Sequence, residues 1–339
     1  MKQLSIIGLS RAGKTCYIYA MAKSMIKGYD GINIIACDDD LRDQLSMGWR
    51  QIRRDMQWPD GSDHVTKCEF SCSINLRPIM DFCWNDFKGG TLSSMNEVDR
   101  KYKKEFQEYL GGSDGLLLFV PADNIQDILH DTEYAEDIQD DLEILNQLFL
   151  NPQIRATLSR VPVTVIVTKA DLLTEQEKSS AYDIVQLLFK PLFEIGNKMR
   201  TLVVPVSIGE NLGRGDQGGA IKGTVYQNPK DGNIHIPILF NLYHFIKDCI
   251  AVEKSHLGEI EVEYQERMRN LRTAEKHNGL QRFWYGEDPG QIRESIHSNQ
   301  NQQRHKKEEI KELESLLKRV ASLFTHDCRY FVDGKIVSF

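Results

Sequence analysis

The stretch GLSRAGKT at residues 8–15 constrains the fold more than any other part of the chain. It has the form G-x-x-x-x-G-K-T, and a phosphate-binding loop of this form requires a strand before it and a helix after it. The apolar run LSIIGL leads into it and predicts a buried strand. Apolar residues spaced by three and four after Thr15 predict a helix that ends near Gly28. This order predicts a P-loop, in which backbone N–H groups at a helix N-terminus hold phosphate groups.

Within this loop, we expect Lys14 to contact the β- and γ-phosphates and the Thr15 hydroxyl to bind Mg²⁺. The other residues expected to bind nucleotide here are Gly8, Ser10, Arg11, Ala12, Gly13 and Cys16. The alternative is an ordinary glycine turn between a strand and a helix. A P-loop alone identifies neither the base nor the reaction, because kinases, ATPases and GTPases all contain one.

A second motif lies in FCWNDFKGG, residues 82–90, where an apolar run ends at Asp86 and Gly89 follows three positions later. A carboxylate at a strand end can hold Mg²⁺ through water, and the N–H of a following glycine can contact a γ-phosphate. Asp and Gly both favour turns, so the D-x-x-G pattern is weak by itself.

Two further strand ends indicate which base is bound. The strand in VPVTVIVTKAD runs directly into Thr168, Lys169 and Asp171. A carboxylate there can accept two hydrogen bonds from guanine N1–H and its amino group, whereas adenine presents no such pair of donors. The next strand ends at Ser207, and we expect Ser207 and Ile208 to lie beside guanine O6. In an open α/β sheet, ligands bind at the carboxyl ends of the strands, where all these motifs would meet.

The four motifs, in this order, resemble the Ras-like, TRAFAC-class GTPases over about residues 2–250. The resemblance implies an α/β P-loop GTPase domain with a mostly parallel sheet, helices on both faces, and GTP or GDP bound with Mg²⁺. It also implies a switch I threonine that binds Mg²⁺, for which Thr66 is the candidate ahead of a strand-like run; a solvent-facing strand residue is the alternative. Asp86 and Gly89 would begin switch II.

An insertion of a strand, a helix and a Trp-Pro turn lies at about residues 29–60, before Thr66. Aspartates at the start of its helix are suited to cap the helix N-terminus. The insertion is similar to that of the double-GTPase type proteins of bacteria, which occur beside defence-type gene clusters.

Catalysis departs from the simple family pattern, because Gly90 stands where many Ras-like GTPases carry a glutamine that orients the attacking water. We therefore expect slow hydrolysis, or completion of the site by a partner. Arg11 and Lys88 could add positive charge near the γ-phosphate, or simply face solvent. The leading hypothesis is a slowly hydrolysing GTP switch that acts through a protein partner. A GTP-binding scaffold without hydrolysis is the alternative, and a P-loop kinase or ATPase ranks last because neither needs T-K-x-D.

The chain beyond the nucleotide motifs is less informative. Residues 251–339 predict a coiled-coil-like helical hairpin that ends in a short β-hairpin. The two helices either pack within the protein or contact an effector or a second copy. The Gly-rich connection at 209–233 is expected to be a mobile surface loop, with a partner-binding element as the alternative.

Composition limits the remaining classes. The net charge of −7 argues against generic nucleic-acid binding, and no apolar run is long enough to suggest a membrane span. The seven cysteines include no C-x-x-C pair, which favours free thiols in a reducing, cytoplasmic setting. The expected partners are therefore a guanine nucleotide, a protein effector or regulator, and a possible second copy of the chain.

Overall fold

The computed structural model describes residues 1–9, 11–59, 67–86, 108–215, 219–277 and 288–339. The chain forms two compact units. The first contains Met1–Asn241 and Phe324–Phe339, and the second contains Leu242–Leu323. None of the described helices is both long enough and apolar enough to cross a membrane.

A nine-stranded sheet organises the first unit, in the order β11-β10-β7-β6-β5-β1-β4-β3-β2. Its central strands β4, β1, β5, β6 and β7 are parallel, whereas both ends of the sheet are antiparallel. Strands β5 and β6 at the centre of the sheet are apolar runs buried along their whole length, which is why they lack an alternating pattern. The bounds of the parallel strands are β1 Lys2–Gly8, β4 Arg77–Asp86, β5 Gly115–Pro121, β6 Pro162–Thr168 and β7 Arg200–Pro205.

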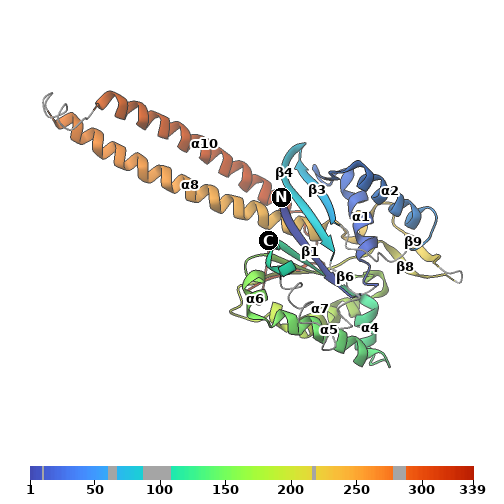
Figure 1. Ribbon diagram of the computed structural model, residues 1–339. Coiled ribbons are helices and arrows are strands. Elements are labelled where there is room, and N and C mark those ends of the chain that lie inside the picture. The colour runs from blue at the N-terminus through green and yellow to red at the C-terminus, as the bar shows by residue number, and fades with distance from the viewer. Residues whose placement is uncertain (10, 60–66, 87–107, 216–218, 278–287) are drawn as a thin grey trace. The chain divides into compact units, whose positions relative to one another are not determined.

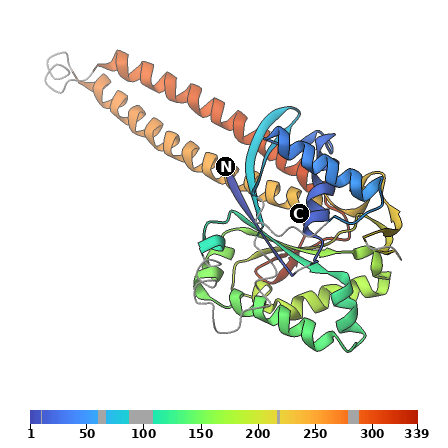
Figure 2. The ribbon, with the colours of Figure 1, turned by 45° about the vertical axis from the view of Figure 1, so that its right-hand side comes forward.

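Helices cover both faces of this sheet (Figures 1 and 2). On one face, Leu116 and Leu118 of β5 pack in a core with residues of four helices: α4 Ala122–Leu129, α5 Ala135–Phe149, α6 Pro152–Leu158 and α7 Glu175–Leu188. On the other face, the ring of Tyr17 in α1 (Lys14–Ile26) contacts the rings of Trp84 and Phe119 edge-on. The fold is therefore the α/β P-loop GTPase arrangement that the sequence predicts.

The insertion contains the expected strand and helix, β2 (Ile32–Ala36) and α2 (Asp39–Arg53). Strand β2 pairs with β3 (Lys67–Ile74) and forms one edge of the sheet. The Asp38 carboxylate caps α2 by accepting a hydrogen bond from the Leu41 N–H at 2.8 Å. Asp38 therefore has the capping role that the sequence suggests for the aspartates at the start of this helix.

The Gly-rich connection differs from the mobile loop expected from the sequence. Its described residues form an antiparallel hairpin, β8 (Gly209–Arg214) with β9 (Ile221–Val225), followed by the short helix η4 (Pro229–Gly232). Glycine content suggested mobility, but several of these glycines occupy close backbone contacts that only a residue without a side chain tolerates. At Gly232, for example, a Cβ atom would lie 1.8 Å from the carbonyl oxygen of Ser207.

The predicted C-terminal β-hairpin is present as β10 (Arg329–Val332) and β11 (Lys335–Val337). Strand β10 pairs with β7, so the hairpin extends the sheet of the first unit and is not part of the helical unit. The carboxylate of Asp333 at its turn accepts hydrogen bonds from the N–H groups of Gly196 and Lys198 at 2.7 and 3.0 Å. These long-range contacts, which sequence spacing does not reveal, join the C-terminal residues to the nucleotide domain.

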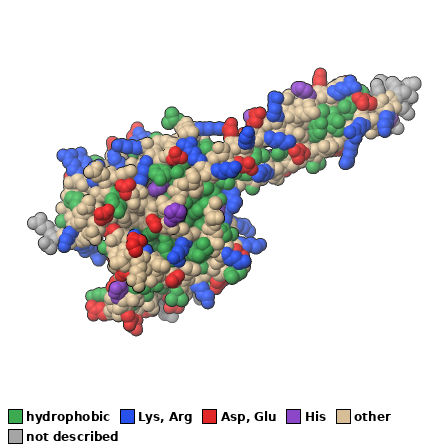
Figure 3. All heavy atoms as spheres, turned by 180° about the vertical axis from the view of Figure 1, so that it is seen from behind, with side chains coloured by type: hydrophobic (Ala, Val, Ile, Leu, Met, Phe, Trp, Pro, Cys, Tyr) green, Lys and Arg blue, Asp and Glu red, His purple; other side chains and the backbone are tan. Residues whose placement is uncertain are grey.

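The described residues of the second unit form two antiparallel helices, α8 (Ile236–Lys276, counted here from Leu242) and α10 (Pro289–Ala321). Ion pairs at 2.7 Å join them: Lys254 with Glu314, Lys306 with Glu253, and Arg293 with Glu275. The Asp288 carboxylate caps α10 through the Gly290 N–H. Basic and acidic side chains are interspersed along the pair on the face that Figure 3 shows.

Candidate functional site

The P-loop connects the end of β1 to the start of α1. Gly13 is the N-cap of α1 and has a left-handed backbone with φ of 80°, a conformation that suits glycine. The Lys14 ammonium donates to the carbonyl oxygens of Gly8 and Leu9 at 2.9 and 3.1 Å. It is therefore held over the loop by the loop's own backbone. Arg11 also has a positive φ, of 64°, and is exposed.

The N-terminus of α1 is suited to bind an anion. Among the described residues, no side chain caps it, and no acidic residue lies in its first turn. Burial raises the pKa of the neighbouring Cys16 thiol to about 12, so this group carries no negative charge at neutral pH. The helix dipole and the unsatisfied N–H groups of a first turn attract phosphate. The half-buried Thr15 lies in this turn.

The T-K-A-D segment lies directly beside the P-loop. Strand β6 ends at Thr168, whose hydroxyl donates a buried hydrogen bond of 2.8 Å to the carbonyl oxygen of Ala12. Lys169 has a left-handed backbone, and its ammonium forms a 2.5 Å ion pair with Asp123 of α4. The structure therefore holds the two predicted nucleotide loops together at the carboxyl edge of the sheet.

The carboxylate of Asp171 is oriented by the β8–β9 hairpin. One of its oxygens, Oδ2, accepts a hydrogen bond from the Leu212 N–H at 2.8 Å. Burial raises the pKa of Asp171, and the Leu212 N–H opposes this rise. A hydrogen bond to the charged form favours ionisation, which a double acceptor for guanine requires.

Ser207 and Ile208 are buried beyond the end of β7. The Ser207 N–H donates to the Gly232 carbonyl at 3.0 Å, and its hydroxyl donates to the Gly209 carbonyl at 3.0 Å. Both donors of Ser207 therefore have partners within the protein in the described arrangement.

The predicted switch residues are only partly described. The backbone of Asp86 ends β4 and pairs in register with Ile6 of β1, two residues before Gly8. This register puts the strand end of Asp86 beside the P-loop strand; the structure does not describe its side chain. Ser10, Thr66, Lys88, Gly89 and Gly90 lie outside the described residues.

The family model described as Double-GTPase 1 matches residues 5–182, which is more than half of the chain. The chain belongs to this family. The matched residues include the P-loop, Asp86 and the T-K-A-D segment. Membership of the Double-GTPase 1 family supports guanine-nucleotide binding by this chain. Both ends of the site fit such a ligand, because an uncapped, acid-free helix N-terminus suits phosphate and the Asp171 carboxylate suits the guanine donors.

The solved structures similar to the chain have low sequence identity to it. A bacterial selenocysteine-specific elongation factor EF-Sec is 14% identical, with a TM-score of 0.29, over 61% of this chain and 26% of that one. A SAR1-type small GTPase from Encephalitozoon cuniculi in complex with GDP is 12% identical, with a TM-score of 0.26, over 56% of this chain and 59% of that one. The elongation factor SelB from Methanococcus maripaludis is 13% identical, with a TM-score of 0.27, over 61% of this chain and 29% of that one.

This chain therefore spans less than two thirds of the length of each of these three proteins. No curated protein matches the sequence.

Two features of the site are not evident from the sequence. They are the Leu212 N–H on Asp171 and the Asp123 carboxylate on Lys169, which come from segments 41 and 46 residues away in the chain. Neither carries a local motif, because Leu212 acts through its backbone and Asp123 is one of many aspartates.

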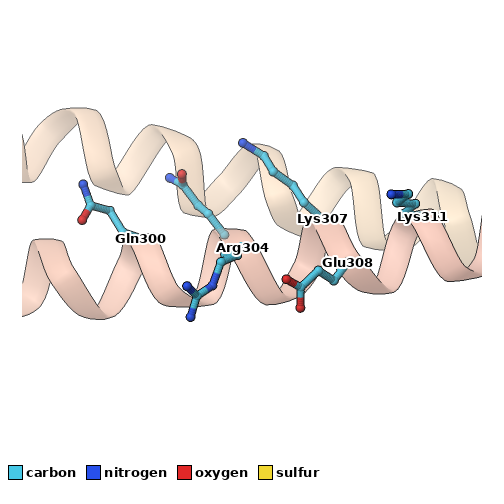
Figure 4. Close-up of a pocket in the computed structure, with 6 residues that line it drawn as sticks. Gln300, Arg304, Lys307, Glu308 and Lys311 are labelled. Carbon is cyan, nitrogen blue, oxygen red and sulfur yellow. The ribbon is translucent and has the colours of Figure 1, made fainter.

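A hollow on α10 of the second unit is a poor candidate for a ligand site. Its walls are polar and charged side chains of this one helix: Gln300, Gln303, Arg304, Lys307, Glu308 and Lys311 (Figure 4). Small-molecule sites are concave and mostly apolar, with a few convergent polar groups. The nucleotide loops of the first unit remain the site that the geometry favours.

Proposed function

We propose that this protein is a GTP-binding switch that hydrolyses GTP slowly and acts through a protein partner. The observation that carries the proposal is the buried hydrogen bond from the Thr168 hydroxyl to the Ala12 carbonyl. It fixes the predicted base loop to the predicted phosphate loop, so one ligand with a base and a phosphate chain would bridge the two.

Each end of the ligand has a proposed set of contacts. Gly13, Lys14 and the first turn of α1 bind the phosphates, and Asp171 binds guanine, with the Lys169 stem along the base. Thr15, Asp86 and Thr66 hold Mg²⁺, since hydroxyl and carboxylate oxygens are the donors it prefers. The ion would supply charge neutralisation at the β- and γ-phosphates.

Slow hydrolysis follows from the residue after the D-x-x-G motif. Phosphoryl transfer depends on positioning and charge stabilisation, and Gly90 has no side chain to orient a water. Arg11, which is exposed, and Lys88 are the candidate positive groups within the chain. The same glycine favours a second candidate function, a GTP-binding scaffold that does not hydrolyse.

Signalling requires that the two nucleotide states differ. In the proposed switch, Thr66 and Gly89 respond to the γ-phosphate, and the helical pair of α8 and α10 contacts an effector or a second copy. A cytoplasmic location suits a GTP-dependent switch, because GTP is abundant there.

Two measurements test the proposal. Single-turnover hydrolysis by the purified chain should be about 10⁻³ s⁻¹ or slower, as in Ras-like proteins without an activator. Fast turnover that is lost in Arg11→Ala would replace the slow-switch account with catalysis by Arg11.

Hydrogen exchange at residues 60–68 and 87–100 should be slower with a non-hydrolysable GTP analogue than with GDP. Identical exchange in both states would leave the scaffold as the function.

A further inference from the structure

The β8–β9 hairpin contains a bulge that depends on the absence of a side chain at Gly223. The pairing of the two strands shifts between Glu210 and Gly213, which leaves Asn211 and Leu212 outside the regular ladder. Opposite them, Gly223 has a φ of +103°, and a Cβ atom there would lie 2.4 Å from the Asn211 carbonyl oxygen. Bulges of this kind redirect backbone groups and are frequent beside functional sites.

The redirected group is the Leu212 N–H, and its partner is Asp171. The 2.8 Å bond uses one acceptor position of Oδ2. A carboxylate has about four such positions, so guanine and Leu212 can be bound at the same time. Rotation about the terminal torsion of an aspartate is soft, and a fixed N–H therefore sets the plane in which the carboxylate meets its ligand.

The outer edge of the hairpin is bound to the insertion. The Ile221 N–H donates to the Met56 carbonyl at 2.7 Å, and the Trp58 N–H donates to the Gly219 carbonyl at 2.7 Å. The Trp58 indole N–H also reaches β8, where it donates to the Gly213 carbonyl at 3.3 Å. Residues 56–58 thus lie antiparallel to residues 219–221, at the start of β9.

We propose that the β8–β9 hairpin is a positioning element of the guanine site that couples base occupancy to residues 56–58 of the insertion. The proposal rests on the assignment of guanine to Asp171. Leu212 is a positioning residue, because it acts on the base through the Asp171 carboxylate. A bound base would restrict the motion of the Asp171 carboxylate, and this carboxylate holds the bulge through the Leu212 N–H. The bulge in turn stabilises the hairpin to which Met56 and Trp58 are hydrogen-bonded.

The first test compares two glycines of the same hairpin in the full chain. Gly223→Ala forces a Cβ against Asn211, whereas Gly213→Ala adds a Cβ with no atom within 4 Å and serves as the control. The probes are GDP and IDP, which lacks the guanine amino group and thus one donor to Asp171. We expect the preference for GDP over IDP to fall about tenfold in Gly223→Ala and to be unchanged in Gly213→Ala.

The second test addresses the coupling and does not depend on the folding of the glycine variant. Hydrogen exchange at residues 56–58 should slow when GDP binds to the wild-type chain. Trp58→Phe keeps an aromatic ring but loses the indole N–H. It should retain the GDP preference and show less slowing than the wild type, because the indole bond to Gly213 is lost while the backbone bonds of Trp58 and Met56 remain.

An unchanged GDP preference in Gly223→Ala would overturn the positioning role of the hairpin, and unchanged exchange at residues 56–58 on GDP binding would overturn the coupling. Either result would leave guanine binding intact. A wild-type chain that binds ADP as well as GDP would instead overturn the proposed function.

Discussion

Helices α1 and α7 begin beside the two predicted nucleotide loops, but their N-termini differ in side-chain capping and in charge. Helix α1 begins at Gly13, with a lysine and no acid in its first turn. Helix α7 begins at Thr174, which forms a reciprocal capping box with Glu177. The N-terminus of α7 is satisfied within the chain, whereas that of α1 suits an external anion. Substitutions at α1 should therefore cost ligand binding, and substitutions at α7 should cost stability alone.

The largest effect is expected from Lys14→Ala. Hydrogen bonds to charged groups contribute about 1.5–3 kcal/mol each, so the loss of this cation should weaken GDP binding about a hundredfold or more. The matched control is Lys178→Ala on α7, whose ion pair with Glu175 is local and exposed. Titration calorimetry should show unchanged affinity for the control. Equal affinity in both variants would refute the anion site at α1.

An intermediate effect is expected from Thr168→Val, which leaves the Ala12 carbonyl without its buried donor. An unsatisfied buried group costs about 1–3 kcal/mol, and here the cost should appear in both stability and GDP affinity. Thr164→Val on the same strand is the control, since the Thr164 hydroxyl is buried with no partner in the described structure. Thermal unfolding with and without GDP measures both effects; a Thr168 variant that binds GDP normally would show that the two loops act independently.

A smaller effect, on stability alone, is expected from Thr174→Ala. Removing an N-cap of this type costs about 1 kcal/mol. Denaturant unfolding should show this loss, while GDP affinity stays at the wild-type value. A fall in GDP affinity comparable with that of Lys14→Ala would abolish the distinction between the two helix termini.

The smallest effect concerns pH. The N–H and hydroxyl of Thr174 lower the pKa of Glu177 from 4.5 to about 2, with a further contribution from His130. A carboxylate with a lowered pKa stabilises the fold above its unfolded pKa, and this contribution is lost as the pH falls from about 4.5 toward 2. Glu177→Gln should therefore be less stable than wild type at pH 7, and the difference should shrink across that window. A difference that does not vary with pH would mean that the charge of Glu177 contributes nothing.

The local parts of the site could be predicted from the sequence. The strand, glycine turn and helix around Lys14 lie within 26 residues, and periodicity with turn chemistry is sufficient to define them. The same holds for the strand that ends at Thr168. Both depend on neighbours in the chain, where sequence patterns carry the most information.

The long-range parts could not be predicted. The pairing of β10 with β7 joins residues more than 120 positions apart, and the Leu212 N–H reaches Asp171 through a bulge that no motif marks. Glycines such as Gly223 suggested a mobile loop, because sequence alone does not distinguish a glycine of a flexible chain from one forced by a close backbone contact.

Nucleotide competition tests the central claim most directly, namely that one ligand places its phosphates at α1 and its guanine at Asp171. Wild-type protein should bind GTP, and an excess of ATP or XTP should not displace it. Asp171→Asn replaces a double acceptor by an amide that also donates, so it should lose GTP affinity and prefer XTP. If ATP displaces GTP from the wild-type protein at equal concentration, or if Asp171→Asn leaves the base preference unchanged, Asp171 is not the guanine-binding residue.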